Sequence, residues 1–296
     1  MTSTPHTSQA LSFLGLGEMG SALASAALRA GHATTVWNRS ADKTAPLVEA
    51  GARAASTAGD AVDAADLIVV CLFDHASVHD VLDPLADRLT GKSILNLTTT
   101  SPYGARELAR WSAAIGADYL DGGVMATPEM IGTPVAGVLY SGSRRLYQEY
   151  RTIFESWGTA EYFGDDAGMA SLYDLALLSS MYVMFAGFFH GAAMVGAAGV
   201  PAKEFAARAV DWLRAVVPAI AEYADVIDGG DYSVPGQQSL EFSDISDIVE
   251  ASRAQGISTE LVDVVQRLIH RQIDAGHGSD GFARVVESIK DPEVAA

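Results

Sequence analysis

Apolar residues follow two different spacings along the first 166 positions of the chain. Short apolar runs, typical of buried strands, are separated by segments in which apolar residues recur every three or four positions, as on one face of a helix. Strands that alternate with helices predict a doubly wound, mostly parallel sheet. The expected strands begin at Leu11, Thr34, Leu67, Ser93, Tyr119 and Gly137, and helices are expected in the Leu11–Ser40 segment and at 41–50, 61–65, 78–89, 103–115 and 146–157.

The pattern changes after Gly168. One helix is expected from Gly168 to about Val200, and its stretch from Leu175 to Val200 contains no Asp, Glu, Lys or Arg. This stretch is long enough to span a bilayer, but its small residues and the absence of a basic cluster on either side favour a buried helix. A monomer of this size can hardly cover such a helix, so we expect a second subunit to cover it. Further helices are expected at 202–224, 239–255 and 258–275.

The segment Gly15–Gly20 reads GLGEMG, a G-x-G-x-x-G between the first expected strand and an alanine-rich helix. In a dinucleotide-binding fold the first glycine makes the tight turn, the second lets the backbone approach a pyrophosphate, and the third lets helix and strand pack closely. The alternative, a fortuitous glycine turn, does not explain this context. We therefore expect Gly15, Leu16, Gly17, Glu18, Met19 and Gly20 to bind the cofactor.

The end of the second expected strand indicates which dinucleotide binds. NAD-binding proteins place an acid there to hold the ribose 2′-hydroxyl, whereas this chain has Asn38, Arg39 and Ser40, followed by Lys43. An arginine fork is suited to a 2′-phosphate, so the pattern predicts NADP(H). The alternative is that Arg39 is an ordinary surface residue.

Three fold-level expectations follow from these patterns. Residues 1–10 should be a flexible tail, residues 11–166 an α/β Rossmann domain that binds NADP(H), and residues 167–296 an all-α domain for dimerisation and substrate binding, entered by a long interdomain helix. We expect the tail to be a loose end rather than a signal peptide.

Composition limits the partners. Lys and Arg number 19 against 37 Asp and Glu, a net charge of −18, and this charge disfavours nucleic acid. Cys71 is the only cysteine and lies in an apolar run, so we expect a buried strand residue, no internal disulfide and a cytoplasmic protein. We expect no metal ion and no membrane partner.

Ligands of open parallel sheets bind outside the carboxyl ends of the strands. The residues that follow the expected strands are therefore site candidates, although each could equally be an ordinary loop residue. For the cofactor these are Leu72, Phe73, Asn96 and Thr98, and for the substrate Thr99, Met125, Ala126 and Thr127.

Several longer motifs together resemble the imine reductases and reductive aminases, which are relatives of the β-hydroxyacid dehydrogenases. They are GLGEMG, VWNRS, NLTTTSP, YLDGGVMATPEMIG, VLYSGS, GMASLYDLALLSSMY and AGHG, spread from about Leu11 to Phe282. The resemblance implies reduction of imines or iminium ions to amines with NADPH, an imine or a carbonyl plus an amine as substrate, and a homodimer with interleaved C-terminal helices. Hydroxyacid dehydrogenases carry a lysine on the long helix, and none occurs here between Gly168 and Val200.

The resemblance assigns the catalytic position to Asp174, as proton donor or stabiliser of the iminium. Tyr182 lies eight residues later, about 80 degrees around the helix and roughly two turns along it. The alternatives are a helix-end acid for Asp174 and a packing residue for Tyr182. The remaining pocket candidates are Leu178, Met181 and Phe185 on the same helix, with Trp212, Gln237 and Gln238 from the partner subunit.

One residue leaves the exact activity open. Thr99 stands where reductive aminases tend to carry an asparagine, which puts efficient reductive amination in doubt without affecting imine reduction. A β-hydroxyacid dehydrogenase-like enzyme and a non-catalytic NADP(H)-binding protein remain the alternatives.

His190 is expected to be a hydrogen-bonded core residue.

Overall fold

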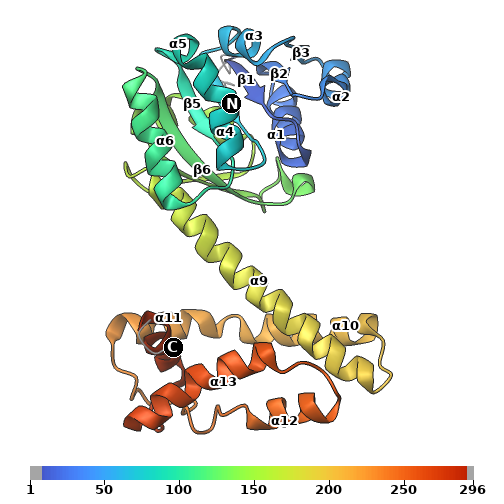
Figure 1. Ribbon diagram of the computed structural model, residues 1–296, viewed down its shortest axis with the longest axis vertical. Helices are drawn as coiled ribbons and strands as arrows, with labels where there is room; N and C mark the ends of the chain where they lie inside the picture. The colour runs from blue at the N-terminus through green and yellow to red at the C-terminus, as the bar shows by residue number, and fades with distance from the viewer. Residues whose placement is uncertain (1–8, 292–296) are drawn as a thin grey trace, which may run out of the picture. The chain divides into compact units, whose positions relative to one another are not determined.

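The computed structural model describes residues 9–291 and divides into two compact units, 1–179 and 180–296 (Figure 1). The predicted tail lies outside the described residues except for Gln9 and Ala10. Ala10 is the first residue of a strand, so this strand begins one residue before the expected strand at Leu11.

The first unit is built on one eight-stranded sheet. Its order is β3-β2-β1-β4-β5-β6-β7-β8, and only β6 and β7 pair antiparallel. The mostly parallel Rossmann sheet predicted from the sequence is thereby confirmed. The strands are β1 (Ala10–Leu14), β2 (Ala33–Trp37), β3 (Arg53–Ala54), β4 (Leu67–Val70), β5 (Ser93–Asn96), β6 (Asp118–Met125), β7 (Gly137–Gly142) and β8 (Thr159–Tyr162).

Two of these strands, β3 and β8, are not predicted from the sequence, because their residues are mostly polar or small. In the structure β3 is exposed, and the residues of β8 are alternately exposed and half-buried. Strand β6 runs to Met125, four residues beyond the expected end, because it gains the antiparallel partner β7. Cys71 follows β4 and is partly exposed, which corrects the expectation of a buried strand residue.

The helices of this unit connect the strands. They are α1 (Glu18–Arg29), η1 (Ala41–Thr44), α2 (Ala45–Glu49), α3 (Ala58–Asp63), α4 (His75–Leu82), η2 (Asp83–Leu85), α5 (Ala86–Leu89), α6 (Pro102–Ala114), η3 (Pro128–Met130), α7 (Arg144–Glu149) and α8 (Arg151–Glu155).

Three expected helices of this unit are divided in the structure. The segment 41–50 is η1 and α2. The segment 78–89 is α4, η2 and α5, because Pro84 has no N–H and cannot continue a helix. Helix α4 also begins three residues earlier than expected, where the Asp74 carboxylate accepts the Ser77 N–H at 2.8 Å and caps it. The segment 146–157 consists of α7 and α8, which meet at Tyr150.

The core of this unit lies on both faces of the sheet. In β4, Leu67 and Val69 pack into one cluster, and Ile68 and Val70 pack into the other. Alternate residues of a strand point to opposite faces, so a wholly apolar strand is the pattern of a sheet covered on both sides.

The second unit is helical in the part of the chain that the structure describes, as predicted. Helix α9 (Gly168–Ala197) begins in the first unit and ends in the second. It is followed by α10 (Ala202–Val216), α11 (Ala219–Gly229), α12 (Ser246–Ala254), α13 (Glu260–Gln272), the short π-helix η4 (Ile273–His277), η5 (Phe282–Arg284) and α14 (Val285–Lys290).

The expected helix 202–224 is divided at Pro218, for the same reason as at Pro84. The expected helix 239–255 begins only at Ser246, because Ser239 instead forms an isolated antiparallel bridge with Gly281. His190 is hydrogen-bonded to Ser252, with 2.9 Å between its Nε2 and the serine Oγ, in agreement with the packing role expected for it.

Helix α9 is long and apolar enough to cross a membrane by length and composition, but this criterion is weak evidence by itself. Most of its side chains beyond Asp174 are half-buried or exposed in the single chain.

Candidate functional site

The glycine turn leads from β1 into α1. Gly15 has a φ of +103°, and a Cβ there would lie 2.2 Å from the carbonyl oxygen of Cys71. A Cβ at Gly20 would lie 2.2 Å from the carbonyl oxygen of Gly15, whereas a Cβ at Gly17 would meet nothing within 4 Å. Two glycines are therefore required by packing, and the third leaves open space before the helix.

That open space lies at the start of α1, where Gly17 provides no side-chain cap. The first amide groups of a helix have no partner within the helix, and they favour an anion. The turn consequently fits a dinucleotide pyrophosphate, and Gly17 is the position at which the ligand can approach the backbone.

An open cleft of about 490 Å³ surrounds this turn. It is lined by Gly15, Gly17, Glu18, Met19, Gly20, Trp37, Asn38, Arg39, Ser40, Lys43, Cys71, Leu72, Phe73, Ser77, Asp80 and Val81. Eleven of the residues predicted for the cofactor are in this wall. Sequence reasoning missed Trp37, Cys71, Ser77, Asp80 and Val81, of which the last three belong to α4.

Three predicted cofactor residues lie behind the wall. Leu16 is buried, and its N–H donates to Asn38 Oδ1 at 2.9 Å. Thr98 is buried and its Oγ1 accepts the Leu72 N–H at 2.9 Å. Asn96 is fully buried. These residues hold the turn, the end of β2 and the loop after β4 in place.

The basic side chains at the end of β2 are free to meet a phosphate. Within residues 9–291, no carboxylate forms an ion pair with Arg39 or Lys43, and both side chains are exposed. Two acids, Glu18 and Asp80, also line the cleft. The arginine and lysine fit a ribose 2′-phosphate, and no acid stands at the strand end to bind a 2′-hydroxyl.

A second feature of the carboxyl edge is a buried carboxyl on β6. The strand register aligns Leu14, Val70, Asn96 and Asp121 across four neighbouring strands. Adjacent strands are about 4.8 Å apart, so Asp121 lies about 14 Å from the end of β1, directly before the glycine turn. The buried acid and the cofactor turn therefore share one edge of the sheet.

Asp121 is fully buried and holds three hydrogen-bond partners. Tyr119 donates its hydroxyl at 2.8 Å, Ser171 donates its hydroxyl at 2.5 Å, and the Asn96 amide lies 3.4 Å away. Burial raises the pKa of Asp121 to about 7, and the negative charge of Asp174 adds to this rise.

Asp174 lies one turn after Ser171 on α9 and is 4 % exposed. Burial raises its pKa to about 6. The pKa of Asp121 is raised further, to about 7, because Asp121 is more completely buried. A carboxyl with a pKa near neutrality can exist both as the acid and as the anion at working pH. The start of α9 is fixed by Ser141 on β7, whose hydroxyl accepts from the Ala170 N–H at 2.8 Å and donates to the Ala167 carbonyl at 2.9 Å.

The other pocket candidates of the first unit have different environments. Thr99 is exposed in the loop after β5, and Met125 is the last residue of β6. Ala126 packs against the core, Thr127 precedes η3, and Leu178 is half-buried on α9.

The remaining candidates belong to the second unit. Met181 is half-buried, whereas Tyr182, Phe185 and Trp212 are exposed. Gln237 packs against Gly281: a Cβ added to Gly281 would lie 2.7 Å from the Cβ of Gln237. The Gln238 carbonyl accepts the Phe282 N–H at 2.9 Å.

Comparison with known proteins agrees with this architecture. Residues 10–165 match the family of the NAD binding domain of 6-phosphogluconate dehydrogenase, and residues 166–291 match the NADPH-dependent reductive aminase-like C-terminal domain. An NADPH-dependent reductive aminase of Aspergillus oryzae is 38 % identical over 288 residues, which cover 96 % of this chain and 98 % of that protein.

Two solved structures are similar over nearly the whole chain. A reductive aminase from Aspergillus terreus, in complex with NADPH and ethyl-5-oxohexanoate, has a TM-score of 0.90 and 41 % identity, covering 96 % of this chain and all of the other. An imine reductase from Myxococcus stipitatus, in complex with NADP⁺, has a TM-score of 0.88 and 33 % identity, covering 95 % and 99 %. The chain belongs to the family of NADPH-dependent reductive aminases and imine reductases.

Proposed function

We propose that this protein reduces imines or iminium ions to amines with NADPH. The observation that carries the proposal is Asp174, a nearly buried carboxyl with a pKa raised to about 6. It lies on α9, where a hydroxyacid dehydrogenase would need a lysine, and no lysine occurs between Gly168 and Val200. An acid of this kind suits a nitrogen substrate, whose charge changes during reduction.

NADPH supplies the hydride when it is bound. The amide groups at the start of α1 would hold its pyrophosphate, and Gly17 leaves the room for it. Arg39, Ser40 and Lys43 would hold the 2′-phosphate. Leu72 and Phe73 extend the same wall.

Asp174 would act on the substrate nitrogen in one of two ways. As the acid it would donate a proton to a neutral imine, which makes the carbon a better hydride acceptor. As the anion it would stabilise a preformed iminium cation. Tyr182 is the second candidate donor on α9, and its phenol would serve if Asp174 is only electrostatic.

We propose that the following residues of one chain line the substrate pocket: Thr99, Met125, Ala126, Thr127, Leu178, Met181 and Phe185. Trp212, Gln237 and Gln238 are proposed to complete it from the partner subunit. Position 99 is a threonine rather than the asparagine that reductive aminases tend to carry. We therefore propose that preformed imines are better substrates than a carbonyl with a separate amine.

We propose a homodimer with interleaved C-terminal helices because the apolar surface of α9 is uncovered in the single chain. Tyr182 and Phe189 are 64 % and 63 % exposed, and Val183 is 60 % exposed. A contiguous apolar surface of this kind is typical of an interface. A membrane is the competing occupant. The net charge of −18 and the lack of a basic cluster beside α9 favour a second copy, and we also propose a cytoplasmic location.

The test follows NADPH absorbance with three substrate sets. A cyclic imine should be reduced, a ketone with an amine should be reduced more slowly, and NADP⁺ with small 3-hydroxy acids should give no turnover. Oxidation of the hydroxy acids would establish the dehydrogenase alternative. NADPH binding without turnover of any imine in a broad panel would establish the non-catalytic alternative.

A further inference from the structure

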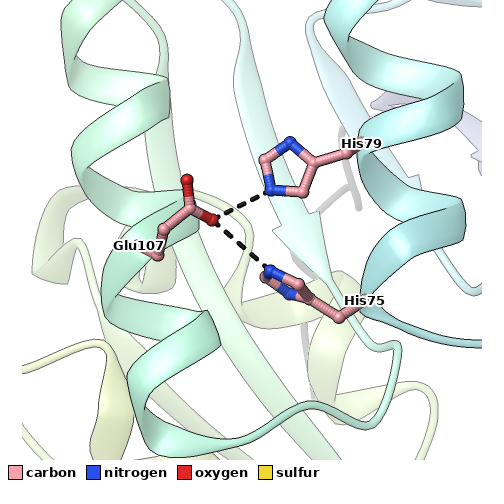
Figure 2. A group of neighbouring side chains, drawn as sticks. All are labelled: His75, His79 and Glu107. Atoms are coloured by element: carbon pink, nitrogen blue, oxygen red, sulfur yellow. Dashed lines mark hydrogen bonds and ion pairs between the residues drawn. The ribbon is translucent and has the colours of Figure 1, made fainter.

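A cluster of two imidazoles and a carboxylate lies apart from the cofactor cleft, between α4 and α6. Figure 2 shows His75 and His79 on α4 pointing toward Glu107 on α6. Glu107 Oε2 is 2.9 Å from His79 Nε2 and 3.5 Å from His75 Nε2. All three potential ligand atoms lie within 4.8 Å of one another.

Although the sequence alone predicts no metal ion, we infer that His75, His79 and Glu107 form a binding site for one divalent transition-metal ion of the Zn²⁺ class. In a tetrahedral site with bonds of about 2.1 Å, the ligand atoms are about 3.4 Å apart. The two separations from Glu107 Oε2, 2.9 Å to His79 and 3.5 Å to His75, fall on either side of that value. Two imidazoles and one carboxylate form a donor set that zinc commonly takes.

The outer nitrogens of both rings have partners that orient them. His79 Nδ1 is 3.0 Å from Asp83 Oδ1, and His75 Nδ1 is 3.1 Å from Thr100 Oγ1. Histidine ligands of metals are usually held in this way by a carboxylate or another acceptor at the second ring nitrogen. The arrangement directs Nε2 of each ring toward the same point.

These hydrogen bonds leave an electrostatic conflict that a cation resolves. The Asp83 carboxylate only accepts, so His79 Nδ1 carries the proton of that bond. In the neutral ring, Nε2 then presents a lone pair to Glu107, which is also an acceptor. Two acceptors 2.9 Å apart require a proton or a metal ion between them.

The backbone around the cluster is fitted closely. A Cβ at Gly104 of α6 would lie 2.4 Å from Thr100 Oγ1 and 2.9 Å from His75 Nδ1. The glycine thus lets α6 approach the imidazole. The three side chains remain 25 % to 36 % exposed, which gives an ion access and leaves a coordination position for water.

The site is independent of the proposed function. Ser77, Asp80 and Val81 of α4 line the cofactor cleft, and their positions are on the opposite face of that helix from His75 and His79. We expect the ion to fasten α4 to α6 and to raise the thermal stability of the N-terminal unit.

The experiment uses the full chain, without an affinity tag and dialysed against a chelator, titrated calorimetrically with ZnCl₂ at pH 7.5. We expect binding of one ion per chain and a rise in Tm. His79→Ala and Glu107→Gln should each weaken that binding at least about tenfold, and Asp83→Asn should weaken it about 10- to 100-fold. His270→Ala is the matched control, because His270 pairs with Asp244 without a second imidazole, and it should bind zinc as the unmodified chain does.

A second readout uses the fluorescence of the unmodified chain, with one variant as its control. Trp111 is 6.1 Å from the His79 ring, so Co²⁺ or Ni²⁺ in the site should quench its fluorescence, and Trp111→Phe should abolish that quenching. Zinc binding that is unchanged by His79→Ala and Glu107→Gln, or no binding at pH 7.5, would overturn the inference whether or not the protein reduces imines.

Discussion

Asp174 of α9 lies directly against Gly123 of β6. A Cβ built on Gly123 would be 2.8 Å from the Asp174 Cβ and 3.1 Å from its carboxyl carbon. The absence of a side chain at Gly123 is therefore what admits the carboxyl to this place beside the sheet. The position of the proposed catalytic acid depends on a residue that makes no chemical contribution.

Gly123→Ala should displace Asp174 and reduce both stability and turnover. Overpacking of this kind costs about 1–3 kcal/mol, and kcat should fall while the Kd for NADPH remains unchanged. Denaturant unfolding and NADPH absorbance measure the two effects. Gly137→Ala on β7 is the control, because its nearest contact would be Met125 at an ordinary 3.8 Å. Equal effects of the two substitutions would contradict the steric explanation.

Asp174→Asn should keep the shape of the side chain and remove its charge and proton. General acids contribute about 10²- to 10⁴-fold, so kcat for a neutral cyclic imine should fall in that range. A permanently charged iminium should be affected less if Asp174 is mainly an acid, and equally if it is mainly an electrostatic partner. NADPH affinity and Tm report whether the fold is intact. Full kcat on both substrates would leave Asp174 without a catalytic role.

The pH dependence of kcat/KM should follow the raised pKa of Asp174. If Asp174 is the acid, activity on a neutral imine should fall as pH rises through about 6, because the carboxyl loses its proton there. This fall in activity with rising pH should be absent in the Asp174→Asn variant. If Asp174 serves as an anion, activity on a charged iminium should instead rise over the same range.

Asp121 should make stability depend on pH in the opposite sense to most carboxylates. Its pKa is raised from 3.8 to about 7 in the folded protein. Between these values the folded state binds more protons than the unfolded state, so its contribution to the free energy of unfolding falls as pH rises. The free energy of unfolding of the unmodified chain, relative to that of Asp121→Asn, should therefore change over this pH range. The change should be about 1.4 kcal/mol for each unit by which the folded and unfolded pKa values of Asp121 differ.

Denaturant unfolding between pH 4 and 7 measures this dependence for Asp121. Asp228→Asn, at an exposed aspartate of α11, is the control and should leave the pH profile unchanged. An Asp121→Asn profile parallel to that of the unmodified chain would show that the buried carboxyl is ionised throughout.

Arg39→Ala should raise the KM for NADPH and leave the KM for NADH nearly unchanged, since only NADPH carries the 2′-phosphate. Steady-state kinetics with both cofactors measure the split. Arg53→Ala, an exposed arginine on β3 outside the cleft wall, should change neither value. Equal use of the two cofactors by the unmodified protein would remove the basis of the NADPH assignment.

Light scattering at micromolar concentration should show a homodimer. Val183→Asp places a charge on the exposed apolar surface of α9 and should shift the protein toward monomers with loss of activity, whereas Val183→Ala should remain dimeric. A stable and active monomer of the unmodified chain would contradict the proposed interface.

The sequence by itself determined the elements whose signals are local. The apolar runs of β1 and β4, the G-x-G-x-x-G between β1 and α1, and the absence of an acid after β2 all lie within short windows of the chain. The strand–helix alternation then predicted the parallel sheet, because parallel strands require crossovers. Pro84 and Pro218 are also local signals, because each lies where an expected helix is divided. The expected helices 78–89 and 202–224 are drawn from the amphipathic pattern alone, which does not take these prolines into account.

The tertiary structure decided what depends on distant residues. Strands β3 and β8 carry little apolar pattern and exist because a neighbouring strand supplies their hydrogen bonds. The contribution of α4 to the cleft wall, the row that places Asp121 beside Asn96, and the approach of Glu107 to two imidazoles all join segments that are 20 or more residues apart. The raised pKa values of Asp121 and Asp174 arise from burial among those segments, and burial is a property of the packed fold rather than of any window of sequence.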